Sequence, residues 1–200
     1  MKSLFLVRFG EAATDEIMAE ARIEYRDLIP RIPYVGGREP FTRFLISTAQ
    51  YLALYKVLKS RGLSLEESGQ FIYDVSDRLL NAYPGFLLRF LSGSIFSRKY
   101  IQKVREGAEE SQRRVYPGNY VFSFVEDDGV EYDYGVDYIK CGVCKFLEAE
   151  DALELAPYVC AVDILYSERA RAPTHSHETV KPNPRSQHPL KGKLKTLKSL

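Results

Sequence analysis

The spacing of apolar residues changes from a helical to a strand period near residue 118, and this change constrains the fold more than any other feature of the sequence. Before it, apolar residues recur every three or four positions, as they do along one face of a helix. The pattern predicts helices over 11–28, 41–58, 64–83 and 96–114, separated by Pro and Gly residues. The helix at 41–58 has the widest apolar face, so we expect it to lie at the centre of the fold.

Residues 119–139 have the strand period. Aromatic residues and Val alternate over 119–125 and again over 131–139, and the Asp and Gly residues at 127–129 are typical of a tight turn. These segments predict an antiparallel hairpin. One face of its second strand carries Tyr132, Tyr134, Val136 and Tyr138. We expect this face to point inward, against the helices.

The helical spacing returns after the hairpin, over 141–150 and 153–169. The order helices, hairpin, helices predicts an α+β fold. It consists of an N-terminal helical bundle (1–118), an antiparallel β-hairpin and two C-terminal helices that carry a cluster of cysteines. A chain of 200 residues suits a single domain of this kind, which we expect to span 1–170.

The C-terminal end of the chain differs in composition from the rest. Residues 169–200 hold eight basic residues and one acidic residue, a charge of +7, which leaves −6 for residues 1–168 of a chain whose net charge is +1. All three histidines lie there too. Such a segment cannot bury enough apolar surface to offset its ordering entropy, so we expect 171–200 to be a basic, Pro-rich, disordered tail. Acid–base chemistry in the folded part must then use Asp, Glu, Cys, Tyr or Lys.

The composition also argues against several classes of function. No window approaches about 18 uncharged apolar residues, so no segment is expected to cross a membrane. The small net charge argues against specific nucleic-acid binding. An odd number of cysteines argues for a reducing compartment, and the apolar run at 4–7 is too short for a secretory signal. We expect a soluble, cytoplasmic protein with a small-molecule substrate, and the oligomeric state is left open.

The cysteines lie close together in the sequence. Cys141 and Cys144 directly follow a predicted strand at the start of a helix, and because they are three residues apart they share one helix face. Cys160 and Asp163 have the same spacing on the next helix. The N-terminus of a helix stabilises a thiolate and lowers the pKa of a thiol. If the two helices pack together, three sulfurs and a carboxylate converge.

Three chemistries fit such a cluster. A Cys-x-x-Cys pair between a strand and a helix is typical of a thiol oxidoreductase of the thioredoxin type. Alternatively, Cys141, Cys144 and Cys160 could bind zinc, with Asp163 as the fourth ligand. In the third interpretation one cysteine is a nucleophile for a hydrolytic step, with an acidic or Tyr side chain as the proton carrier. The sequence requires no cofactor and leaves the choice open.

Three segments, Tyr134–Tyr138 (YGVDY), Cys141–Phe146 (CGVCKF) and Glu154–Asp163 (ELAPYVCAVD), resemble the L-2-amino-thiazoline-4-carboxylic acid hydrolase family. The resemblance is dense over 120–168. It implies an enzyme, a C–N hydrolase, that opens a small cyclic amidine carboxylate. Water adds at the amidine carbon of the thiazoline ring and gives a carbamoyl derivative of L-cysteine.

The resemblance also implies roles for particular residues. The positions that it marks as catalytic are Cys141, Cys144, Cys160, Asp163 and Asp137. A thiolate would attack the ring carbon while an Asp moves protons, and Lys140 and Lys145 flank the cysteine pair as cations for the substrate carboxylate. Nothing after Ala170 resembles the closing segment of the family. The alternative is therefore a non-catalytic member that binds a small ligand or a partner.

Overall fold

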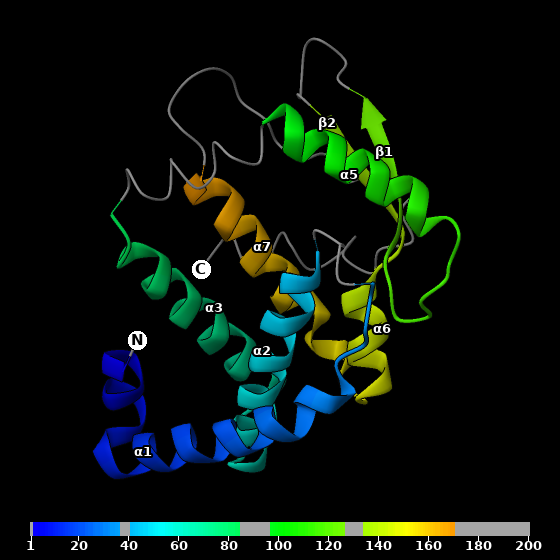
Figure 1. Ribbon diagram of the computed structural model, residues 1–200. Coiled ribbons are helices and arrows are strands. Elements are labelled where there is room, and N and C mark those ends of the chain that lie inside the picture. The colour runs from blue at the N-terminus through cyan, green and yellow to red at the C-terminus, as the bar shows by residue number, and fades with distance from the viewer. Residues whose placement is uncertain (1, 37–40, 85–96, 127–133, 171–200) are drawn as a thin grey trace.

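The computed structural model describes residues 2–36, 41–84, 97–126 and 134–170 (Figure 1). Over these residues, helices are followed by a two-stranded antiparallel hairpin and then by helices, so the predicted α+β fold is confirmed. The elements are α1 (Lys2–Leu28), η1 (Ile29–Arg31), α2 (Thr42–Ser60), α3 (Leu65–Asn81), α5 (Arg98–Ser111), β1 (Val121–Glu126), β2 (Tyr134–Lys140), α6 (Gly142–Ala149), η3 (Leu153–Leu155) and α7 (Ala156–Ala170). The hairpin and α5 lie together at the end of the molecule opposite α1 (Figure 1).

The first helix begins earlier than the apolar spacing predicts. The backbone of Gly10 (φ 76°, ψ 175°) kinks α1 and separates residues 2–9 from the predicted helix. A positive φ of this kind favours Gly, which has no Cβ to clash. In the first segment, Phe5 and Phe9 contact the Phe71 ring of α3 edge-on, with centroids 4.7 and 5.3 Å apart. Packing against a distant helix therefore stabilises a segment that carries little helical pattern of its own.

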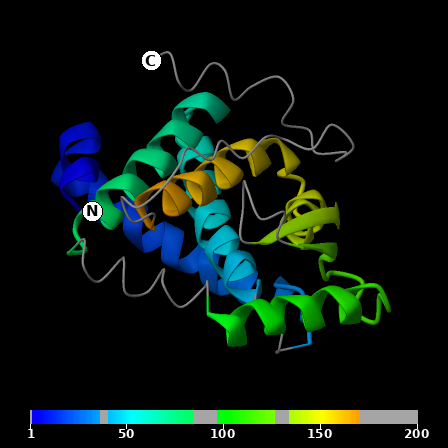
Figure 2. The ribbon, with the colours of Figure 1, turned by 90° about the horizontal axis from the view of Figure 1, so that it is seen from above.

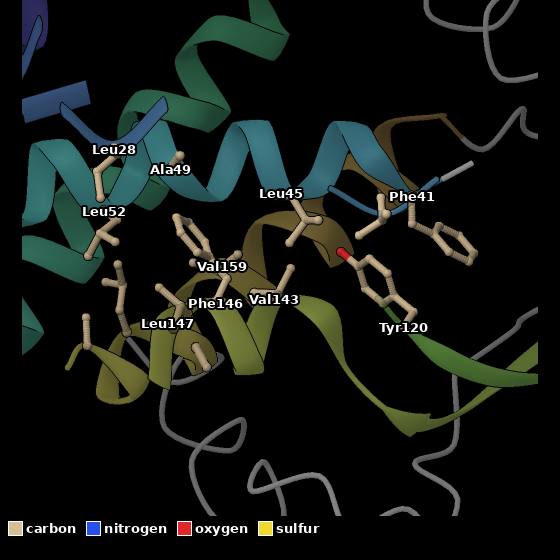
Figure 3. Close-up of a cluster of buried hydrophobic side chains, with 14 of the residues drawn as sticks. Leu28, Phe41, Leu45, Ala49, Leu52, Tyr120, Val143, Phe146, Leu147 and Val159 are labelled. Carbon is tan, nitrogen blue, oxygen red and sulfur yellow. The ribbon is translucent and has the colours of Figure 1, made fainter. Parts of the chain in front are cut away.

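Helix α2 lies at the centre of the fold, as its wide apolar face predicts. It contacts α1, α3 and α6. Its buried residues are Leu45, Thr48, Ala49, Leu52, Ala53, Tyr55, Val57 and Leu58. Figure 3 shows side chains of α2 pointing toward Val143, Phe146 and Leu147 of α6. Each fully buried Leu or Phe contributes about 2–3 kcal/mol, so this core fixes the position of α6 firmly.

Helix α3 begins at Ser64 and Glu67, which form the capping box that their spacing predicts. The Glu67 N–H donates to Ser64 Oγ (3.1 Å), and the Ser64 N–H donates to Glu67 Oε2 (2.9 Å). The helix then packs along α7 (Figure 2). At the contact, Gly69 lies directly against the ring of Tyr158, where a Cβ would collide with the ring.

The aromatic face of the hairpin packs inward, as expected, although its second strand is only partly buried. Tyr138 of β2 lies 5.7 Å from the ring of Phe41 and 6.1 Å from that of Phe122, which is fully buried. Tyr134 stacks on Phe124 of β1 at 5.8 Å with nearly parallel rings. These contacts join the hairpin to the residues that precede α2.

A bulge lies at the base of the hairpin. Phe122 pairs with Tyr138, whereas Val121 pairs with Lys140, so Ile139 is an extra residue on β2. A bulge bends a strand and increases its local twist. Here it stands two residues before Cys141 and redirects the chain from the sheet into α6.

Three predictions fall outside the described residues: the turn at 127–129, the start of the second strand with Tyr132, and the basic tail at 171–200. The buried core connects Leu28 near the end of α1 with Val159 of α7, and so includes both the helical part and the residues after it. In the part of the chain that the structure describes, no helix is both long and apolar enough to cross a bilayer.

Candidate functional site

Cys141 lies at the junction of β2 and α6. Its backbone is extended (φ −91°, ψ 124°), and its carbonyl accepts a hydrogen bond from the Lys145 N–H (3.2 Å) that opens the helix. The next residue is Gly142, at which a Cβ would stand 2.8 Å from the ring of Tyr120. Cys144 lies in the first turn of α6 and shares the face of Cys141. The two thiols are therefore neighbours at the positive end of a helix.

The surroundings of Cys141 lower the pKa of its thiol to about 7. The largest cause is the S–H of Cys144, which donates a hydrogen bond to the Cys141 sulfur. The N–H groups of Cys144 and Val143 and the charge of Lys145 also favour the thiolate, while burial opposes it.

The other two thiols stay protonated. The pKa of Cys144 is raised far above its usual range, first because its proton is held in the hydrogen bond to Cys141 and second because of burial. Burial on α7 raises the pKa of Cys160 to about 12, and the negative charge of Asp163 adds to the effect. Of the three thiols, Cys141 is therefore the one whose surroundings favour the thiolate.

Asp163 on α7 is influenced by the charge of Cys141 at the start of α6. Burial on α7 raises the pKa of the Asp163 carboxyl to about 7, and the negative charge of Cys141 contributes to the shift. Cys141 also raises the pKa of Cys160, and Cys160 raises that of Cys144. The charge of Cys141 thus contributes to the raised pKa of each of the other three groups.

Asp137 and Lys140 have a different environment. Both are exposed on β2, where Asp137 pairs in register with Ser123 and Lys140 with Val121. Neither is among the leading influences on the pKa of the described thiols or of Asp163. Lys140 lies next to Cys141 in the chain, at the surface.

The ammonium group of Lys145 is bound by the backbone. It donates to the carbonyl oxygens of Pro117 (2.8 Å) and Asn119 (2.6 Å), and so ties α6 to the segment that precedes β1. Burial lowers the pKa of Lys145, and repulsion from Lys140 and Arg114 lowers it further. Lys145 therefore holds the start of α6 in place and supports the Cys141 thiolate through its charge.

Metal binding gains no geometric support from the described residues. Among them, no group of three or more His, Cys, Asp or Glu side chains is arranged to hold a metal ion. The zinc site at Cys141, Cys144 and Cys160 stays a prediction.

The two best-formed hollows among the described residues lie away from the thiols. One of ≈ 270 Å³ lies between α1 and α2, beside Glu20 and Lys56. The other, of ≈ 510 Å³, borders α3 at Asp74 and Arg78. Cys141, Cys144 and Cys160 are each half-buried.

Gly142 and Tyr120 shape the site, although neither is apparent as a site residue from the sequence. A side chain at Gly142 would push the ring of Tyr120 away from the start of α6. The signal was the Gly itself, because Gly in the first turn of a helix costs stability and usually marks a close approach. Which ring approaches it depends on the fold and cannot be read from the sequence.

No protein-family model, curated protein or solved structure matches the chain. The resemblance of residues 134–163 to the thiazoline hydrolases therefore stays a prediction. The function has to be argued from the geometry and the electrostatics of the site.

Proposed function

We propose that this protein is a thiol-dependent hydrolase that opens a small cyclic amidine carboxylate of the thiazoline class. Cys141 is the nucleophile and Asp163 the proton donor. The observation that carries the proposal is a thiol at the start of α6 and a carboxyl group on α7 whose surroundings bring the pKa of each to about 7, with the charge of Cys141 contributing to the raised pKa of Asp163. General acid–base catalysis is most efficient when the groups titrate near the working pH. The resemblance of residues 134–163 to the thiazoline hydrolases supplies the substrate class.

The proposed reaction has two covalent steps. The Cys141 thiolate attacks the sp² carbon between the ring nitrogen and the ring sulfur in the imino tautomer, whose ring nitrogen already carries one proton, and a C–S bond to the enzyme forms. The ring C–N bond then breaks, and the leaving nitrogen takes the proton of Asp163. Water attacks the same carbon, returns a proton to the Asp163 carboxylate and releases the Cys141 thiolate. The product is a carbamoyl derivative of L-cysteine, and both catalytic groups return to their starting state.

Two neighbours support this chemistry. Cys144 holds the Cys141 thiolate through its S–H hydrogen bond. Lys140 is exposed beside Cys141, whereas the ammonium group of Lys145 is engaged with two carbonyl oxygens. We therefore assign the substrate carboxylate to Lys140.

Turnover of 2-amino-thiazoline-4-carboxylate by the full chain tests the proposal. We expect Cys141→Ala to lower kcat by more than about 10³-fold, because the nucleophile is lost. Asp163→Asn should lower kcat by about 10²–10⁴-fold with little change in KM, since it removes a proton donor. The matched control is Glu109→Gln, which removes an exposed carboxylate on α5 and should leave kcat unchanged.

Two other results would decide against this mechanism. Saturable binding of the same compound without turnover would contradict the hydrolase and favour the non-catalytic, ligand-binding alternative. Turnover that a chelator abolishes and Zn²⁺ restores would place a metal at the cysteines in place of a free nucleophile. Unchanged turnover in the chelator supports the thiol mechanism.

A further inference from the structure

The pair Cys141 and Cys144 has a reactivity that the hydrolytic steps do not use. Both thiols are free and half-buried, and both lie at the start of α6. In the proposed hydrolysis Cys144 only donates a hydrogen bond. Its sulfur nevertheless lies beside the most reactive thiol of the described chain.

The backbone geometry suits a disulfide between them. Residues three apart on a helix have Cβ atoms about 5–6 Å apart, and a disulfide needs about 3.5–4.5 Å. Cys141 precedes the helix and has an extended backbone, so a small rotation there can close the gap. A rotation at Cys141 affects the hydrogen bond from the Lys145 N–H to the Cys141 carbonyl, which opens α6, and leaves the hydrogen bonds further along the helix in place.

The two sulfurs also differ, as an ordered exchange requires. Cys141 faces the N–H end of α6 and the charge of Lys145, which favour the thiolate, whereas Cys144 keeps its proton. Cys160 stands on the other helix, α7, and burial keeps it protonated. Cys141 is thus the attacking thiol. Cys144 is close enough to displace a mixed disulfide formed at Cys141, and Cys160 takes no part.

We propose that Cys141 and Cys144 form a redox site that exchanges with low-molecular-weight disulfides of the glutathione type. The Cys141 thiolate attacks one sulfur of the disulfide, and an S–S bond to Cys141 forms while one thiolate leaves. Cys144 then attacks the Cys141 sulfur and expels the second thiolate. The protein dithiol is oxidised and gives up two electrons and two protons. The small disulfide accepts them and is reduced to two free thiols.

This inference does not rest on the proposed hydrolysis, because the disulfide is detected on the thiols themselves with no substrate present. If both hold, oxidation removes the nucleophile. Hydrolysis then stops until a reducing thiol opens the bond.

The sequence makes a direct test simple. Trypsin cleaves after Lys140 and Lys145, so Cys141 and Cys144 are released on one short peptide and Cys160 on another. The folded, reduced full chain is treated with excess glutathione disulfide and quenched in acid. It is then alkylated and digested, and the peptide masses are measured by mass spectrometry. We expect the short peptide to carry an internal disulfide, to resist alkylation and to be restored by reduced glutathione, while Cys160 is alkylated. Alkylation of both Cys141 and Cys144, or a disulfide that includes Cys160, would overturn the proposal.

Variants that each lack one cysteine of the pair test the order of attack. Cys144→Ser leaves Cys141 to attack with no resolving thiol, so a glutathione adduct should accumulate. Cys141→Ser leaves Cys144 to attack. We expect the adduct to form about five- to tenfold faster at pH 7 in the first variant, because a larger thiolate fraction outweighs a lower nucleophilicity. Equal rates would overturn the ordered exchange. Cys160→Ser is the matched control and should form the disulfide at the wild-type rate, and a much slower rate would also count against the proposal.

Discussion

Cys141 and Cys160 are the same residue type in opposite environments. The S–H of Cys144 and the N–H groups at the start of α6 lower the pKa of Cys141 to about 7. Burial among the residues of α7, with Asp163 nearby, raises the pKa of Cys160 to about 12. The reactivity of each thiol therefore depends on its position relative to one helix end and one carboxylate.

The hydrogen bond from Cys144 can be tested by exchanging its donor. We expect Cys144→Ala to move the midpoint of the pH dependence of Cys141 alkylation from about 7 upward, toward the ordinary 9.0, because the largest cause of the lowered pKa is lost. Cys144→Ser keeps an O–H donor in the same place and should keep the midpoint near 7. The measurement is the rate of iodoacetamide alkylation between pH 5 and about pH 10. An equal shift in both variants would show that the hydrogen bond is not the cause.

For individual residues, the sequence predicts which side chains share a helix face but not which other groups surround them. Spacing alone places Cys141 with Cys144, and Cys160 with Asp163, on common helix faces. It also predicts a lowered thiol pKa at the start of a helix, although not which of the two thiols ionises. The carbonyl oxygens that bind Lys145 come from residues 117 and 119, far away in sequence. A flanking lysine expected to meet substrate therefore has a structural role that only the fold reveals.

Asp163 should make stability depend on pH in a particular direction. Its pKa is raised from 3.8 to about 7 on folding, so the folded state binds the proton more tightly than the unfolded state. The stability this gives is complete below about pH 4 and is lost as the pH rises through 7. The full difference corresponds to about 4 kcal/mol, and we expect about 1–3 kcal/mol because the side chain keeps some contact with solvent.

Asp163→Asn should therefore stabilise the protein at pH 8 by about 1–3 kcal/mol and have little effect at pH 4. The measurement is the free energy of unfolding in urea at both pH values. Asp74→Asn, at an exposed site on α3, is the control and should change little at either pH. A loss of stability at pH 8 in Asp163→Asn would contradict the cost assigned to the buried carboxylate.

Elements with local signals are predictable, and elements held by distant contacts are not. The capping box at Ser64 and Glu67 and the apolar face of α2 both lie within single segments, and the structure confirms both. Residues 2–9 form a helix because Phe5 and Phe9 meet Phe71 on another helix. No window of sequence contains that contact, so the apolar spacing places the start of the helix too late.

Two adjacent residues of α3 allow a sharp test of its contact with α7. Ser68 is buried, and its hydroxyl has no hydrogen-bond partner in the part of the chain that the structure describes. Ser68→Ala should therefore stabilise the protein by about 1 kcal/mol. Gly69→Ala should destabilise it by about 1–3 kcal/mol, because the new methyl group meets the Tyr158 ring.

Helix propensity favours Ala at both positions, so it cannot explain opposite signs. The measurement is the midpoint of urea unfolding for the two variants under the same conditions. Stabilisation by Gly69→Ala would mean that α3 and α7 are not in close contact at this point.

The whole molecule depends on contacts between its N-terminal helices and its C-terminal segment. One core cluster contains Leu45 and Leu52 of α2 together with Val143, Phe146 and Leu147 of α6 (Figure 3). Beside this core, Glu150 at the end of α6 binds Arg31 of η1 (3.1 Å) and Lys56 of α2 (3.0 Å). The sequence does not predict these pairs, because Glu150 is more than ninety positions from Lys56.

The ion pairs of Glu150 allow the contact between α6 and the N-terminal helices to be tested. Its side chain is only 7% exposed, while those of Arg31 and Lys56 are 49% and 30% exposed. Glu150→Ala leaves two cations that water can still solvate, so the cost should be below the 3–5 kcal/mol typical of a broken, fully buried pair. The negative end of the α6 dipole also disfavours a carboxylate at this position. We expect a net loss of about 1–2 kcal/mol, measured by circular dichroism in urea because the chain has no tryptophan.

Glu148→Ala is the matched control, since Glu148 is exposed on the same helix and should contribute less than about 0.5 kcal/mol. Glu150→Gln separates charge from volume, because it keeps the shape of the side chain and should lose most of what Glu150→Ala loses. The loss should persist in high salt, where exposed ion pairs are screened more than buried ones. Equal stability of the Glu150 and Glu148 variants would mean that the ion pair adds nothing beyond the apolar core, and that α6 is held to the N-terminal helices by that core alone.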